Sequence, residues 1–134
     1  MDAHASHRPY MDSMSNPSLD RNPRNFEDFW PHYLAAHSKP ACRALHFVGL
    51  SGAALGILAG AALQAPAWAL YGIVFGYGLS WIAHFTVERN RPATFGHPLW
   101  SLRGDLRMYT LWLSGRLEPE LARFPDRMHA PLGA

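Results

Sequence analysis

The chain has 134 residues, about the length of one small domain. Its 12 basic and 10 acidic residues leave a net charge of only +2, and its single cysteine, Cys42, excludes the small secreted scaffolds that depend on internal disulfides. Lys39 is the one lysine, and the arginines are scattered along the chain. We therefore expect no nucleic-acid partner.

The N-terminal part predicts a leader followed by one short helix. Residues 1–25 are rich in Pro, Ser, Asn, Asp and His without apolar periodicity, so we expect a disordered leader and no cleaved signal peptide. Apolar side chains then recur every third or fourth residue over 26–38, which predicts an amphipathic helix with Asn25 as its N-cap. Pro40 should end this helix and begin the next one.

The charged residues are missing from one long stretch. No Asp, Glu, Lys or Arg occurs from Ala44 to Val87, and Gln64-Ala65-Pro66 divides this stretch into two halves. Each half has about 20 residues, the length that crosses the hydrocarbon core of a bilayer. The sequence thus predicts an all-α integral membrane protein built on a hairpin of two transmembrane helices, about 44–63 and 67–87. The alternative is a buried helical hairpin in a soluble protein.

Two patterns indicate how this hairpin packs and how it is oriented. Small residues four apart allow close helix packing in a membrane, and such spacing occurs at Gly52, Gly56 and Gly60 and at Gly72 and Gly76. Basic residues flank only the open end of the hairpin, so both termini are expected in the cytoplasm. These basic residues are Lys39, Arg43, Arg89, Arg91, Arg103 and Arg107.

The C-terminal third predicts a turn, one more helix and a tail. Pro92 and Pro98 bound a turn over 91–98. Residues 99–117 have a broad leucine face but also several charges, which fits an amphipathic interfacial helix better than a third span. We expect an irregular tail over 118–134, so that residues 26–117 form a single membrane domain.

A hairpin brings its two ends together, and two histidines lie at those ends. His46 and His84 should therefore lie at similar depth, and Glu88, four residues after His84, should point to the same side of its helix. Two imidazoles and one carboxylate form the ligand set that suits non-haem Fe(II). His37 or His97 could add a ligand or a supporting hydrogen bond. The simpler interpretation is that these are ordinary interfacial histidines.

Three further residues near these histidines are candidates for binding roles. Arg43 and Arg91 are the candidates for binding a substrate carboxylate, and Arg43 could instead pair with Glu88. Cys42, four residues before His46, could be a soft metal ligand, but a small packing residue is the favoured interpretation. His4, His7 and His129 receive no role.

Two blocks of residues, spread over about 26–112, resemble a known family, the membrane 2-hydroxy fatty acid dioxygenases. Its eukaryotic members act in the α-oxidation step of phytosphingosine breakdown. The blocks are Phe29-Trp30-Pro31, Tyr33-Leu34, His37, Pro40, Arg43, His46-Phe47 and Gly49, followed by Trp81, His84, Glu88 and Asn90-Arg91-Pro92-Ala93.

The resemblance implies a multi-pass helical membrane enzyme that shortens a 2-hydroxy fatty acid by one carbon with Fe(II) and O2. Carried over by position, it implies His37, His46, His84 and Glu88 as catalytic and metal-binding residues, with His97 as a further metal ligand in a stretch typical of bacterial-type members. The expected partners are the fatty acid substrate, O2, the membrane and a second copy of the chain. The expected location is the inner membrane of a bacterium.

The sequence is also compatible with two other functions. One is a non-catalytic membrane protein that binds lipid or a partner through the glycine-lined hairpin. The other is different metal-dependent chemistry on lipids, such as hydrolysis at a zinc site.

Overall fold

The computed structural model describes residues 23–128, so most of the predicted leader lies outside the described residues, as do His4, His7 and His129. The described part is all-helical, as predicted, and contains no strand. Its elements are α2 (Phe26–Ala36), α3 (Pro40–Ala62), α4 (Ala67–Ile82), the π-helix η1 (Ala83–Glu88), the 3-10 helix η2 (Ala93–Phe95), α5 (Pro98–Leu113), α6 (Leu117–Leu121) and α7 (Pro125–Met128).

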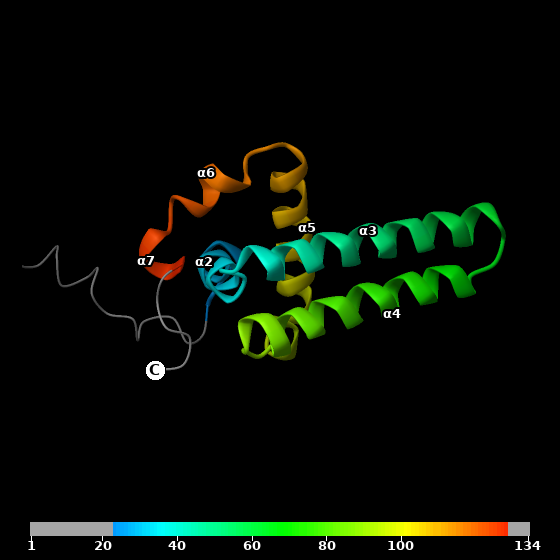
Figure 1. Ribbon diagram of the computed structural model, residues 1–134, viewed down its shortest axis with the longest axis horizontal. Coiled ribbons are helices and arrows are strands. Elements are labelled where there is room, and N and C mark those ends of the chain that lie inside the picture. The colour runs from blue at the N-terminus through cyan, green and yellow to red at the C-terminus, as the bar shows by residue number, and fades with distance from the viewer. Residues whose placement is uncertain (1–22, 129–134) are drawn as a thin grey trace, which may run out of the picture.

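The predicted hairpin is formed by α3 and α4, which run antiparallel and project away from the other helices (Figure 1). The two backbones touch at glycines: a Cβ on Gly56 would lie 2.7 Å from Cα of Gly72, and a Cβ on Gly49 would lie 2.9 Å from the carbonyl oxygen of Gly76. A side chain at these positions would force the helices apart. The prediction that small residues pack the hairpin is therefore confirmed. Gly49 also lies at the contact between the two helices, which was not predicted.

Both arms of the hairpin are long and apolar enough to cross a membrane. The segments that qualify by length and composition are Pro40–Ala62 and Ala67–Glu88, and only about a fifth of each is buried within the protein. Large apolar side chains such as Leu55, Val74 and Ile82 are more than half exposed along them. Exposed apolar surfaces of this extent mark sites that contact a partner or a membrane.

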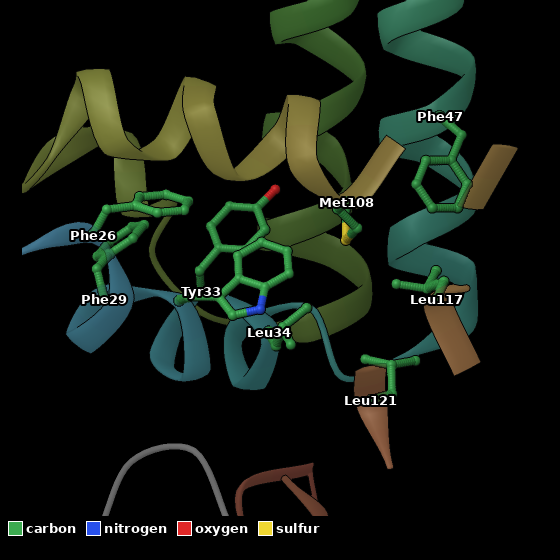
Figure 2. Close-up of a cluster of buried hydrophobic side chains, with 9 residues drawn as sticks. Phe26, Phe29, Tyr33, Leu34, Phe47, Met108, Leu117 and Leu121 are labelled. Carbon is green, nitrogen blue, oxygen red and sulfur yellow. The ribbon is translucent and has the colours of Figure 1, made fainter. Parts of the chain in front are cut away.

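The protein core lies at the open end of the hairpin, where α2, α5 and α6 meet (Figure 2). Its centre is formed by Trp30, Tyr33 and Leu34 of α2 and Met108 of α5, all almost fully buried. Asn25 caps α2 as predicted, because its side-chain oxygen accepts a hydrogen bond from the backbone N–H of Asp28 at 2.9 Å.

The second arm ends in a π-helix that the sequence did not predict. Residues Ala83–Glu88 continue α4 without a break but with the wider π-helical turn. Arg89 then adopts a left-handed conformation, with φ of 58°, and its N–H bonds the carbonyl of His84. Because single π-helical turns often mark functional sites, this segment directs attention to His84 and Glu88.

The prediction for the C-terminal part was wrong in two respects. α5 ends at Leu113 rather than at 117, because Gly115 turns the chain with φ of +68°. The tail was expected to be irregular, but it forms α6 and α7, and Leu117 and Leu121 are buried in the core. Tertiary contacts hold this short helical segment: Trp30 Nε1 donates to Glu120 Oε1 at 2.8 Å.

Candidate metal centre

Three histidine rings from three different elements meet inside the protein. His37 follows the last residue of α2, His46 lies in the second turn of α3, and His84 belongs to η1. Their ring centroids are 4.5 Å apart for His37 and His46, 4.5 Å for His37 and His84, and 5.1 Å for His46 and His84. Each residue is at most 2% exposed. The predicted convergence of these three residues is therefore present in the fold.

The Nδ1 atom of each ring is held by an oxygen. His37 Nδ1 lies 2.6 Å from the carbonyl oxygen of Tyr33, His46 Nδ1 lies 3.0 Å from Oδ1 of Asp105, and His84 Nδ1 lies 2.7 Å from Oδ1 of Asn90. A carbonyl, carboxylate or amide oxygen only accepts hydrogen bonds, so each Nδ1 carries the proton. Each Nε2 is then left with a free lone pair, the form in which histidine binds metals.

The orientation of the Asn90 amide is fixed by a second contact. Its Nδ2 donates to the carbonyl oxygen of Ala36 at 3.0 Å, so its oxygen is the atom that faces His84. The link also ties the end of η1 to the end of α2. Asn90 therefore sets the tautomer of His84 and the distance between two of the three rings.

The three Nε2 atoms have no protons to share. Nε2 of His37 and Nε2 of His84 lie 3.1 Å apart, and two lone pairs at that distance repel unless a cation lies near both. Nε2 of His46 has no hydrogen-bond partner, and among the described residues it is the only fully buried side-chain nitrogen or oxygen in that condition. Unpaired buried acceptors are costly, so this arrangement fits a bound metal cation.

The electrostatic setting keeps His37 neutral. Burial lowers the pKa of His37 well below its usual value, and the neighbouring rings of His46 and His84 lower it further. A neutral imidazole is required for metal binding, so His37 is ready to act as a ligand at neutral pH.

Cys42 joins the three histidines as a fourth potential donor. It is fully buried, and its Sγ together with one nitrogen from each of His37, His46 and His84 forms a group whose members all lie within 4.8 Å of one another. The sequence interpretation favoured packing for this residue. Imidazoles with a thiol are donors that both Fe(II) and Zn(II) accept, so the donor set alone does not choose between these metals.

Glu88 is not part of this group. Its Oε1 accepts a hydrogen bond from the backbone N–H of Lys39 at 2.6 Å, and its Oε2 accepts one from Ser38 Oγ at 3.2 Å. Glu88 thus caps the N-terminus of α3, where a negative charge is favourable. The expectation that Glu88 and His84 point to the same side assumed α-helical spacing, which the π-helix replaces.

Two other predicted site residues make aromatic contacts instead, and His97 is not a member of the donor group. The ring of His97 is tilted against that of Phe29 and lies edge-on to that of Trp100, with ring centroids 5.5 and 4.9 Å away. Arg91 lies over the ring of Phe95, 5.6 Å from its centroid.

Arg43 is buried, and its NH1 donates to the carbonyl oxygens of His37 and Ser38 at 2.9 and 2.7 Å. It therefore holds the link between α2 and α3 in the position that His37 requires.

Sequence reasoning missed the residues that support the rings from behind. Asp105 of α5 accepts hydrogen bonds from both His46 and the hydroxyl of Tyr33, which points toward α5 in Figure 2. Burial and the nearby Asp105 carboxylate raise the pKa of Tyr33 well above its usual value, so the phenol keeps its proton as a donor. Asp105 is the only acidic residue of α5, but Arg103 and Arg107 lie two residues away on either side, so the local sequence reads as an ordinary charged helix face.

Comparison with known proteins bears on this site directly. A family model described as 2-hydroxy-palmitic acid dioxygenase Mpo1-like matches residues 23–117, which include all four members of the donor group. No curated protein and no solved structure matches the chain.

Proposed function

The chain belongs to the 2-hydroxy-palmitic acid dioxygenase Mpo1-like family, and on that basis we propose that it is an iron-dependent membrane enzyme that shortens long-chain 2-hydroxy fatty acids by one carbon. The observation that carries the proposal is the meeting of three buried imidazoles whose Nε2 atoms carry free lone pairs. Three imidazoles can hold a divalent ion and leave coordination positions for other ligands.

The proposed reaction balances without an added reductant. A 2-hydroxy acid, RCH(OH)COOH, and O2 give RCOOH, CO2 and water. The bond between C1 and C2 breaks, and the four electrons lost by these two carbons are the four that O2 takes up. Bound Fe(II) would supply the redox chemistry by which O2 reacts with the acid.

The residues of the chain have separate tasks in this proposal. His37, His46 and His84 bind the metal, while Asp105 and Asn90 keep the Nδ1 protons in place and so fix the ring orientations. Burial of all three rings keeps bulk water away from the centre, which protects a reactive site from side reactions.

We also propose that the hairpin spans the membrane with both termini in the cytoplasm. Support comes from the length and exposure of the two apolar arms and from basic residues at the open end, such as Lys39 and Arg89. The candidate metal centre lies at that end of the hairpin, where an amphipathic fatty acid could reach it sideways from the bilayer. The inner membrane of a bacterium is the location proposed.

One observation favours a second candidate function. Cys42 places a thiol beside the three imidazoles, and a site with three histidines and one cysteine also suits Zn(II). The alternative is therefore a zinc site that serves hydrolysis of a lipid or a purely structural role.

Product analysis with the purified full chain tests the proposal. Protein loaded anaerobically with Fe(II) and then given O2 and 2-hydroxypalmitate should form a C15 acid and CO2. His46→Ala and His84→Ala should abolish this turnover. The control is Leu58→Ala, which replaces an exposed side chain of α3 and should leave turnover unchanged. If iron-loaded protein converts no 2-hydroxy acid of any chain length, the proposed reaction is wrong.

A further inference from the structure

A groove runs along the hairpin beside the candidate metal centre, in the angle between α3, α4 and α5. It encloses about 370 Å³, which is within the range of small-molecule binding sites. Its walls include Gly49, Ala54, Ile57, Ile73, Ser80 and Asp105. A second groove of about 600 Å³ lies elsewhere on α3 and reaches Trp112 and Leu117.

Helical spacing connects the first of these grooves to the metal centre. Gly49, Leu50, Ala53 and Ile57 line it, and they follow His46 by three, four, seven and eleven residues. These intervals place all of them on the face of α3 that carries His46.

The second groove lies on the other side of the same helix. It is lined by residues such as Val48, Ser51 and Leu55, which follow His46 by two, five and nine residues. Those intervals point away from His46. Of the two grooves, only the first is lined by a residue that hydrogen-bonds one of the rings, Asp105.

The wall contributed by α4 shows the same relationship. Ser80, Tyr77 and Ile73 line the first groove and precede His84 by four, seven and eleven residues. Two of the three histidines thus belong to the same helix faces as the two long walls of the groove.

The groove is polar at one end and apolar at the other. Asp105 stands at the end near the rings, one hydrogen bond away from His46, and Ser80 is one turn before His84. Apart from these two residues and Tyr77, the lining consists only of Gly, Ala, Leu and Ile. Such a groove matches a ligand with a polar head and a long apolar chain.

The length of the groove favours a long alkyl chain. The eleven residues from His46 to Ile57 correspond to about 16 Å along the helix. With C–C bonds of about 1.5 Å, an extended alkyl chain advances about 1.25 Å per carbon, so this distance accommodates about 13 carbons.

We propose that this groove holds the alkyl chain of the substrate. The carboxyl end of the 2-hydroxy acid lies at the histidines, and the methyl end lies between Ile57 and Ile73, so that residues along the groove set the preferred chain length. The inference rests on the proposed function and adds to it the face of the hairpin that binds the chain.

Chain-length profiles of two matched variants test the groove. Ala54 is exposed on α3 and lines the groove, whereas Ala61 is exposed on the same helix, seven residues further on, and does not line it. Ala54→Phe should lower kcat/KM for C16 and C18 2-hydroxy acids by about tenfold or more relative to C10 and C12, with unchanged iron content. Ala61→Phe should keep the wild-type profile. A wild-type profile in Ala54→Phe would overturn the proposal and leave the proposed reaction standing.

A binding measurement makes the test independent of turnover. A 2-hydroxy acid that carries a photoreactive diazirine near its methyl end is irradiated with the full-length protein, and the labelled peptides are identified by mass spectrometry. We expect labels around Ala54, Ile57 and Ile73. Labels concentrated at Trp112 and Leu117 would place the chain in the other groove and contradict the proposal, even if no turnover is detected.

Discussion

The carboxylate of Asp105 lies 3.0 Å from Nδ1 of His46, although the two residues are 59 positions apart in the sequence. The same oxygen accepts the hydrogen bond from the Tyr33 hydroxyl, so one carboxylate joins α2, α3 and α5 at the back of a candidate metal ligand. Close packing makes this possible: a Cβ on Gly104 would lie 2.8 Å from the ring of Tyr33. Asp105 should therefore affect the affinity of the site for metal through its hydrogen bond with His46, without binding the metal itself.

Replacement of Asp105 tests this support. Asp105→Asn removes the negative charge behind His46 and should lower metal affinity by about 10- to 100-fold, the usual cost of losing such a partner. The measurement is a competition titration of the purified full chain with a chelator of known affinity. Asp126→Asn, at an exposed aspartate of α7, is the control and should bind metal like wild type. Equal affinities in both variants would show that Asp105 does not support the site.

Replacement of Glu88 distinguishes its two possible roles, as a metal ligand or as a cap of α3. In the structure it caps α3 through Lys39 and Ser38, so Glu88→Gln should retain iron and lose about 1 kcal/mol of stability. Iron content after desalting and the thermal unfolding midpoint in detergent measure the two effects. Loss of iron with unchanged stability would instead favour the metal-ligand role predicted from the sequence.

Two glycines of the hairpin offer a matched pair for testing how the arms pack. A Cβ on Gly56 would meet the carbonyl oxygen of Trp68 at 2.6 Å and Cα of Gly72 at 2.7 Å, whereas a Cβ on Gly78 would meet nothing within 4 Å. Gly56→Ala should therefore lower the unfolding midpoint. Gly78→Ala should leave it unchanged or raise it, because alanine favours helix over glycine by about 1 kcal/mol. If both variants have the same midpoint, close backbone contact does not hold the hairpin.

The hairpin and the meeting of His46 and His84 could be predicted because each has a local signal, whereas His37 was predicted only as one of two possible further ligands. The run without charges from Ala44 to Val87 has the length of two spans, and the turn between them brings His46 and His84 to one end. Pro40 marks where the second helix begins, and the structure has this proline at the first helical position.

The support of the site could not be predicted, because it depends on tertiary contacts. Nothing in the local sequence tells that Asp105 faces His46 or that Asn90 faces His84. The π-helix has no compositional signature either, and it changes the direction in which Glu88 points. The short helix α6 forms because Leu117 and Leu121 are buried against the core, which a pattern of five residues does not reveal.

The proposed function depends on iron binding by Nε2 of His37, His46 and His84. The most direct measurement is the iron content and the iron-edge X-ray absorption spectrum of the full chain, loaded anaerobically with Fe(II) and desalted. We expect roughly one iron per chain with scattering from about three imidazoles, partly lost in His46→Ala and unchanged in His97→Ala, since His97 lies against Phe29 and Trp100. Protein that retains no iron, or a spectrum that His46→Ala leaves unaltered, would contradict it.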